Sequence, residues 1–487
     1  MHKTGILLHI SSLPSDFGIG DFGPEAIQFA EYLKTEGYTY WQILPITHCG
    51  YGNSPYNPLS AFALNPYFIS PELLYQQGLI NQRMLKAVKI PASNITQYER
   101  VYNLKDKMLA QATDNWMLTN NLDDYIEENA FFLKPYLTFL SLSRIYDDSC
   151  WYNWNEEHKH YSEALYQKTR QLDSSFINIK AATQAMLSEQ LKYFKEYLHK
   201  MGIILVGDLP LYLSYDSSEV WAHPEFFDLD EQGRRLHFAG VPPDAFSEKG
   251  QLWGNPLYKW DVLQQDSFKL FMNRIGMALS YLDILRLDHF IGYVNYWQVK
   301  PNFDEKGHPI LPQNAINGSW EPALPEEFFS TLLKNYGIER FLAEDLGILN
   351  QEVCRVRDSF GFPGMIILQF CFEDSVPEVK KYPPERWLYT GTHDNHTIRG
   401  WFESLPSDSL SLKHLQEYCI QNKITDIHQM INSENIHNIM RNIALSSGCQ
   451  QIIFPLQDIL GLGDEARMNV PGTALGNWQW RLEERIY

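Results

Sequence analysis

Residues 281–290 read YLDILRLDHF, and this stretch joins a buried-strand pattern to a charged end. It is apolar apart from Asp283 until it reaches Arg286, Asp288 and His289. Taking an unpaired charge out of water is costly. A strand that served stability alone would rarely end in three titratable groups, which indicates that this end of the strand has a function.

Seven further apolar runs are each closed by polar residues, glycine or proline. Continuous rather than alternating hydrophobicity is typical of strands covered on both faces, as in a parallel sheet. Helical patterns lie between several runs, for example at 24–37 and 189–202. The runs predict an α/β protein, a (β/α)8 TIM barrel in preference to a doubly wound sheet. In chain order the eight runs are ILLHI, YWQILPI, GIILVGDLPLYL, YLDILRLDHF, RFLAEDLG, GMIILQF, WLYTGTHD and QIIFPLQDI.

Two spacings are too long for simple crossovers, so we expect a single catalytic barrel over 1–487 that carries inserted subdomains. Residues 70–185, between the second and third strands, have helical periodicity and predict a mainly helical subdomain. Residues 214–262 predict a loop and hairpin insertion near the active site. This insertion holds FDLDEQGRRLHF, a hairpin pattern around Gln232–Gly233, and then the loop GVPPDAF.

Charge and cysteine usage exclude several classes of protein. The net charge of −19 opposes a nucleic-acid partner. The six cysteines lack CxxC spacing, which fits reduced thiols better than a disulfide framework or a zinc site. The N-terminal apolar run is too short for a signal peptide, and no segment approaches the about 20 apolar residues of a membrane span. We therefore expect a soluble, cytoplasmic protein that binds neither nucleic acid nor membrane.

The aromatic content, 14% of the chain, has two interpretations. Aromatic rings suit a groove that stacks on sugar faces, and they equally suit a core rich in Phe and Tyr. Composition alone leaves both open.

Three motifs resemble cofactor or metal sites. GIGDFG, at 18–23, matches the dinucleotide fingerprint in spelling, but seven residues separate it from the preceding strand, so we expect a loop that leads into a helix. Asp228 and Asp230 suggest a calcium loop that lacks its final glutamate. The group His393, Asp394 and His396 lacks a third histidine at helical spacing. We expect neither a metal nor a nucleotide cofactor.

Four of the apolar runs end near a carboxylate: Asp208, Asp288, Glu344 and Asp394. A single carboxylate at a strand end is usually a cap or an ion-pair partner. Four such groups on different strands of one barrel would meet at the carboxyl ends of the strands, where barrel enzymes place their chemistry. This conjunction indicates an active site.

The two central carboxylates are predicted to differ in protonation. Arg286 and Asp288 are two residues apart, so on a strand they project to the same side, and the guanidinium favours an ionised Asp288. Glu344 follows the apolar FLA without a nearby arginine in sequence, which would raise its pKa. One ionised and one protonated carboxyl is the requirement of retaining glycosidic chemistry.

The chain resembles the amylomaltases, the 4-alpha-glucanotransferases of glycoside hydrolase family 77 in the alpha-amylase superclan. The resemblance covers essentially the whole chain. The motifs that carry it are SSLPSDFGIGDFGP, WQILP, GNSPYNPLSAFALNP, GDLPLY, PPDAFSEKGQLWGNPLYKW, RLDHFIG, AEDLG, GTHDN and FPLQDILGLGDEARMNVPGT.

This resemblance implies that Asp288 is the nucleophile, Glu344 the general acid/base, and Asp394 the carboxylate that holds sugar hydroxyls. It implies transfer of α-1,4-glucan segments between maltose, maltodextrins and other α-1,4-glucans, with glucose as an acceptor and no cofactor. The substrate-binding residues that it implies are Ser54, Tyr56, Asp208, Gln251, Trp253, Arg286, His289, Phe370, His393 and Asn469.

Two positions depart from the family pattern. Ile291 follows RLDHF where a basic residue is expected, and His396 follows THDN where an acidic one is expected.

Two rival functions stay open at this point: a hydrolase of the same clan, which would release the fragment to water, and a non-catalytic glucan-binding protein.

Overall fold

The computed structural model describes residues 2–243, 247–347, 350–424, 431–473 and 475–486. Its centre is a sheet of eight parallel strands in the order β11-β6-β3-β2-β1-β14-β13-β12. A parallel bridge from Ala343, at the end of β11, to Gly364, just before β12, closes the sheet into a barrel. Each of the eight predicted runs supplies one strand, so the (β/α)8 prediction is confirmed. The strands are β1 Lys3–Leu7, β2 Tyr40–Gln42, β3 Ile204–Leu209, β6 Ile284–Leu287, β11 Phe341–Ala343, β12 Met365–Ile367, β13 Trp387–Tyr389 and β14 Gln451–Pro455.

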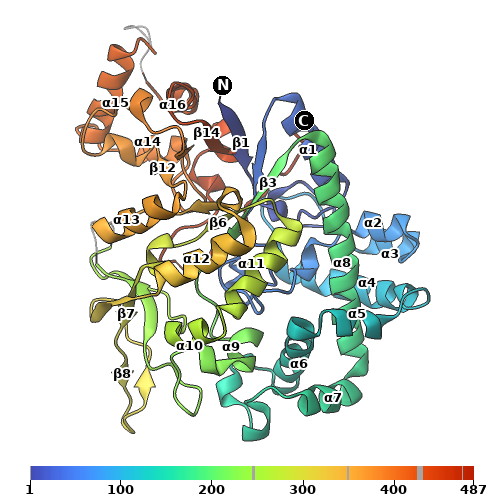
Figure 1. Ribbon diagram of the computed structural model, residues 1–487. Helices are drawn as coiled ribbons and strands as arrows, with labels where there is room; N and C mark the ends of the chain where they lie inside the picture. Colours follow the sequence, from blue (N-terminus) through green and yellow to red (C-terminus); the bar gives the residue numbers. More distant parts are fainter. Residues whose placement is uncertain (1, 244–246, 348–349, 425–430, 474, 487) are drawn as a thin grey trace.

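Helices surround the barrel (Figure 1). The first, α1, begins at Pro24, and Gly37 after its end has a φ of +77°, as the Pro and Gly signals in the sequence predicted. Helix α1 spans Pro24–Thr35. The other helices outside the stretch between β2 and β3, together with its last helix α8, are α8 Ser174–Met201, α9 Ser218–Ala222, α10 Trp260–Gln265, α11 Lys269–Tyr281, α12 Pro325–Tyr336, α13 Gln351–Phe360, α14 Ile398–Ser404, α15 Leu410–Gln421, α16 Ile436–Leu445 and α17 Leu456–Ile459.

The stretch between β2 and β3 is mainly helical. Its last helix, α8, runs unbroken through residue 185 to Met201, where Gly202 caps it in the left-handed conformation. The same helix packs against α4 and α6 and also against β3. The division at 70–185 into a subdomain therefore stays a prediction, and its expected end lies inside one helix. The remaining helices of this stretch are α2 Pro71–Gln76, α3 Gln82–Ala87, α4 Tyr98–Trp116, α5 Leu122–Glu128, α6 Ala130–Tyr146 and α7 Glu163–Leu172.

A small antiparallel sheet lies beside the barrel, in the order β10-β7-β4-β5. The sequence did not predict it, because its short strands come from three separate segments and show no clear alternation. The predicted turn at Gln232–Gly233 is present, with a φ of +79° at Gly233 and a bridge from Leu229 to Arg235. Residues 244–246 of GVPPDAF lie outside the described residues. The strands are β4 Phe238–Val241, β5 Gln251–Leu252, β7 Asn295–Val299 and β10 Gly318–Pro322, and β8 Asn302–Phe303 pairs with β9 Pro309–Ile310.

The cofactor-like motifs have local structural roles. GIGDFG forms the loop between β1 and α1, where a Cβ on Gly20 would come within 1.9 Å of the Ile10 carbonyl oxygen. Asp228 pairs with His237 at 2.7 Å, and Asp230 pairs with Arg234 at 2.7 Å. Within the described ranges we find no cluster of three metal-ligating side chains and no helix that is long and apolar enough to cross a membrane.

Candidate active site

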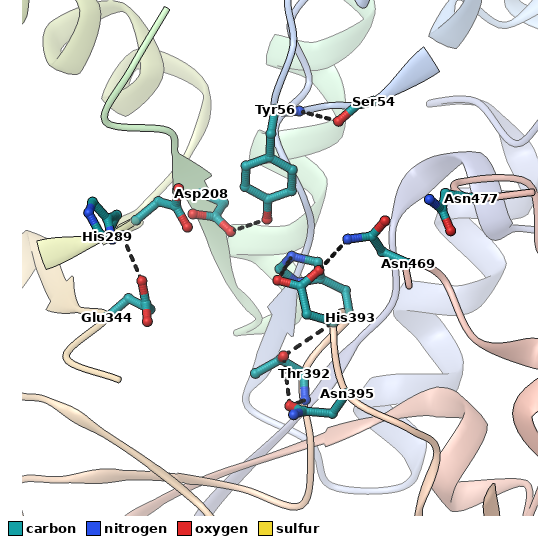
Figure 2. A network of polar contacts seen from close by, with 12 residues as sticks. Ser54, Tyr56, Asp208, His289, Glu344, Thr392, His393, Asn395, Asn469 and Asn477 are labelled. Atoms are coloured by element: carbon teal, nitrogen blue, oxygen red, sulfur yellow. Dashed lines mark hydrogen bonds and ion pairs between the residues drawn. The ribbon is translucent and has the colours of Figure 1, made fainter. Parts of the chain in front are cut away.

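Three of the four strand-end carboxylates lie on adjacent strands of the barrel. Asp208 is on β3, Asp288 follows β6, and Glu344 follows β11, and these strands are neighbours in the sheet. Asp394 lies in the loop after β13. Figure 2 shows that Asp208, His289 and Glu344 lie to one side of Tyr56, and that His393 and Asn469 lie to the other. The barrel thus brings all four loops to one mouth, as the sequence predicted.

Arg286 joins the three adjacent carboxylates. Its Nη1 lies 2.9 and 2.7 Å from the two oxygens of Asp208 and 2.8 Å from Oδ1 of Asp288. Its Nη2 lies 3.8 Å from Oε2 of Glu344. The guanidinium and the Asp208 carboxylate are buried, so each supplies the charge that compensates the other. The prediction that Arg286 and Asp288 share a side is confirmed. Glu344 has no arginine within two residues in the sequence, but Arg286 comes close to it because β6 and β11 are adjacent in the barrel.

Burial dominates the ionisation of the two central carboxyls. It raises the pKa of Glu344 to about 8, opposed by Arg286 and by the His289 N–H, which donates to Oε2 at 2.6 Å. Burial also raises the pKa of Asp288 to about 7, again opposed by Arg286. The raised pKa of Glu344 confirms that prediction. For Asp288 we had expected the guanidinium to prevail, and the structure corrects this, because burial of the carboxyl outweighs its contact with Arg286.

Tyr56 forms one wall of the mouth. Its hydroxyl donates to Oδ2 of Asp208 at 2.7 Å, and its ring stacks on the imidazole of His393 with centroids 5.1 Å apart and planes 14° apart. The Ser54 hydroxyl accepts from the Tyr56 N–H at 3.2 Å and so orders the same loop (Figure 2). Burial lowers the pKa of His393, which favours a neutral ring in this stack.

Asp394 is held by its neighbours and remains accessible. Asn469 Nδ2 donates to its Oδ1 at 2.6 Å, and His393 Nε2 lies 3.3 Å from its Oδ2. The Asp394 side chain is 44% exposed, so it can contact a ligand in the mouth. Arg467 donates to the Asp394 carbonyl, which fixes the backbone of this loop.

Gln251 and Trp253 lie on the opposite side, beside His289. The Trp253 ring meets the His289 ring edge-on, with centroids 4.7 Å apart, and its indole N–H donates to Gln251 Oε1 at 3.3 Å. Trp253 is 40% exposed. His289 has a φ of +51°, and its N–H donates to Oε2 of Glu344. The exposed Trp253 ring therefore contacts His289, the residue that donates to the Glu344 carboxyl.

Phe370 and the two departures, Ile291 and His396, differ in exposure and in partners. Phe370 begins the turn after β12 and is 38% exposed. Ile291 is buried in the turn 290–293. His396 places Nδ1 against Asp464 and Arg467, outside the carboxylate cluster. In the described part of the chain, Arg286 contacts all three carboxylates with these two residues present.

Two buried side chains at the mouth were not predicted from the sequence. The ring of Trp478 lies 5.7 Å from that of Tyr56 and 5.9 Å from that of His393, measured between centroids. His9, two residues after β1, has a buried Nδ1 without a hydrogen-bond partner in the described part of the chain. Both residues stand in recognisable short motifs, His9 in HIS after the first run and Trp478 in NWQW. Neither motif has a sequence spacing that would place it beside His393.

Comparisons with known proteins agree with this geometry. A family model described as 4-alpha-glucanotransferase matches residues 8–485. The chain is 38% identical over 489 residues to a 4-alpha-glucanotransferase of Aquifex aeolicus, covering 99% of this chain and 96% of that protein. It is 35% identical to a 4-alpha-glucanotransferase of Thermus thermophilus, covering 98% and 94% of the two chains.

Solved structures show the same relationship. An amylomaltase from Streptococcus agalactiae in complex with acarbose matches with a TM-score of 0.90 at 32% identity, covering 99% of this chain and 95% of that chain. An amylomaltase from Corynebacterium glutamicum shares the fold, with a TM-score of 0.77 at 16% identity, over 99% of this chain and 71% of that chain. The chain therefore belongs to the 4-alpha-glucanotransferase family, glycoside hydrolase family 77.

Proposed function

We propose that this protein is a 4-alpha-glucanotransferase that moves an α-1,4-glucan segment from a maltodextrin donor to the 4-hydroxyl of glucose or of another α-1,4-glucan. The observation that carries the proposal is the cluster in which Arg286 contacts Asp208, Asp288 and Glu344 at the mouth of the barrel. Such a cluster is expensive to bury and would be hard to explain by stability alone.

The first half of the proposed reaction forms a covalent intermediate. Asp288, ionised and held by Arg286, attacks the anomeric carbon of the donor. Glu344, protonated, gives its proton to the departing glycosidic oxygen. Asp394 accepts hydrogen bonds from hydroxyls of the same sugar, and Asn469 and His393 hold its two oxygens in place.

The second half returns the groups to their starting states. Glu344, now ionised, takes the proton from the 4-hydroxyl of an acceptor glucose. The acceptor oxygen attacks the anomeric carbon, and the bond to Asp288 breaks. Two inversions at the same carbon retain the α configuration.

Two sets of side chains are proposed to bind the sugars. On the donor side, the Tyr56 ring stacks on the sugar, with Ser54, Asp208, Arg286, His393 and Asn469 around it. On the acceptor side, Gln251, Trp253 and His289 provide an exposed ring and an amide, and Phe370 is a further contact at the mouth. Ring stacking on sugar faces is expected to contribute on the order of 1 kcal/mol for each contact.

Maltose, maltodextrins and glucose are the substrates that we propose, and a cytoplasmic location remains a prediction from the sequence. The test is a product assay with maltotriose. Transfer gives glucose together with oligomers longer than maltotriose, hydrolysis gives only shorter sugars, and a non-catalytic binding protein leaves maltotriose unchanged. The second or third result would replace the proposed function by the corresponding rival.

The pH dependence of transfer follows from the two raised pKa values. The reaction needs Asp288 ionised and Glu344 protonated. We therefore expect kcat/KM for maltotriose to rise as Asp288 loses its proton near pH 7 and to fall as Glu344 loses its proton near pH 8. In Glu344→Gln the alkaline limb should disappear from the residual activity. An alkaline limb that persists in this variant would contradict the assignment of Glu344.

Trp253 is expected to favour a sugar acceptor over water. Removing a stacked ring costs on the order of 1 kcal/mol, and about 1.4 kcal/mol changes a rate ratio tenfold. Trp253→Ala should therefore raise the ratio of hydrolysis to transfer several-fold, measured from both products of maltotriose. Trp320→Ala is a matched control, because Trp320 is a similarly exposed ring on β10 of the small sheet. An unchanged ratio with a lowered melting temperature in Trp253→Ala would mean that the ring only packs the loop.

A further inference from the structure

The segment 478–482, which we call the C-terminal strap, is tied at every residue to parts of the chain near the N-terminus. The bonds to its backbone come from Ser12 and from the segment 94–98. The bonds are Tyr98 Oη to the Trp478 carbonyl (2.6 Å), Thr96 N to the Gln479 carbonyl (2.8 Å), Ser12 Oγ to the Trp480 carbonyl (2.8 Å), Arg481 N to the Asn94 carbonyl (2.9 Å) and Leu482 N to the Ser12 carbonyl (2.9 Å).

Trp478, at the start of the strap, has an unusual backbone conformation. Its φ is +63°, a region that a bulky L residue rarely adopts. Its N–H donates to the Met468 carbonyl at 2.7 Å, and its carbonyl accepts from Tyr98, so both ends of the residue are fixed. Residues held in such conformations by their surroundings gather at functional sites.

The Trp478 side chain completes a group of three rings. It is 7% exposed and lies against both Tyr56 and His393, which are stacked on each other. Tyr56 in turn bonds Asp208, which shares Arg286 with Asp288. A shift of the Trp478 ring would therefore be passed to the residues proposed to hold the donor sugar.

Asn477, the residue before the strap, orders the loop at 470–473, which follows Asn469. Asn477 Oδ1 accepts from the Val470 N–H at 2.9 Å, and its Nδ2 donates to the Thr473 carbonyl at 2.9 Å. Val470 follows Asn469, the residue that bonds Asp394, and Figure 2 shows Asn477 on the same side of the site as Asn469. The strap and the residue before it thus border the donor side at two separate places.

We propose that Trp478 is a positioning residue for the donor side of the mouth, fixed there by the C-terminal strap. It acts through Tyr56 and His393, and it sets the affinity for the donor sugar without affecting the acceptor side at Gln251 and Trp253. This inference rests on the proposed glucan transfer. A purely structural role would lower the amount of folded protein and leave the substrate affinities of the folded fraction unchanged.

The test uses Trp478→Gly in the full chain. Glycine adopts a positive φ without strain, so the substitution removes the ring while the backbone can keep its conformation. Rates with isotopically labelled glucose give two KM values: one for maltotriose as donor at saturating glucose, and one for glucose at saturating maltotriose. We expect the donor KM to rise about tenfold or more, because small displacements of positioning groups have large effects, and the glucose KM to stay within about twofold.

Gln479→Ala is the matched control, since Gln479 is tied to Thr96 through its backbone carbonyl, and its donor KM should stay within about twofold of the wild-type value. Trp478→Phe and Trp478→Leu provide a second comparison if the glycine variant does not fold. Phenylalanine, which keeps a ring against Tyr56, should preserve the donor KM better than leucine.

An unchanged donor KM in folded Trp478→Gly, or equal donor KM values for the Phe and Leu variants, would overturn the inference. A rise of both KM values by the same factor would also overturn it, since the effect would then not be confined to the donor side. Failure of the wild-type protein to transfer any label would instead refute the proposed function, so the two failures are distinguishable.

Discussion

Replacing Asp288 with asparagine is expected to lower the rate of glucan transfer by about a thousandfold or more, with little loss of maltodextrin binding. Asparagine has nearly the same shape, and its carbonyl oxygen can still accept from Arg286, which lies 2.8 Å from Oδ1 in the native site. It lacks the negative charge and cannot form the glycosyl ester. Each factor of ten in rate corresponds to about 1.4 kcal/mol, so a thousandfold loss requires only about 4 kcal/mol of lost stabilisation.

The measurement is initial-rate kinetics with maltotriose, together with titration of a maltodextrin into the inactive variant. Asp283→Asn is the matched control, because Asp283 lies just before the same strand, at its opposite end, and pairs with His199 and Lys195. This control should lower thermal stability and keep the turnover of the folded protein. If Asp288→Asn retained a tenth of wild-type turnover, the nucleophile would have to be another group.

Replacing Glu344 with glutamine is expected to slow transfer from maltodextrins by about 100-fold to 10,000-fold, the usual range for loss of general acid catalysis. An aryl maltoside, whose leaving group needs little proton assistance, should lose much less in the step that forms the intermediate. The second step also lacks its base, so the glycosyl ester on Asp288 should accumulate.

Mass spectrometry of the Glu344→Gln protein after reaction with an aryl maltoside would locate the ester. We expect one maltosyl group on the peptide that contains Asp288 and none in the double variant Asp288→Asn/Glu344→Gln. An adduct on another residue would overturn the division of roles between the two carboxyls. Equal rate losses for maltotriose and the aryl maltoside would show that Glu344 is not the proton donor.

The Arg286 guanidinium couples the ionisation of Asp288 to that of Glu344. Because Arg286 contacts Asp208, Asp288 and Glu344, a change at any of these carboxylates redistributes the same positive charge. Removing the charge of Asp288 should therefore lower the pKa of Glu344, since less of the guanidinium charge is then neutralised by Asp288 and a like charge is lost. The two carboxyls titrate as a pair, so their single-variant effects should not add.

The amino-acid sequence by itself determined the barrel and singled out four carboxylates as candidates for its active site. Continuous apolar runs specify strands covered on both faces, and YLDILRLDHF and the other seven runs each became one strand of the barrel. Because parallel strands bring their carboxyl ends to one rim, the sequence predicts a single mouth for Asp208, Asp288, Glu344 and Asp394.

Only the tertiary structure decided how these groups act on one another. The contact of Arg286 with Glu344 depends on β6 and β11 being neighbours, and no local spacing records that distance. The raised pKa of Asp288 depends on how deeply the closed barrel buries it, which its sequence neighbours do not reveal. Trp478 reaches Tyr56 and His393 because the C-terminal strap is tied to segments near the N-terminus. Sequence periodicity encodes local structure and burial, whereas charge coupling and ring contacts depend on distances that exist only after the chain has closed on itself.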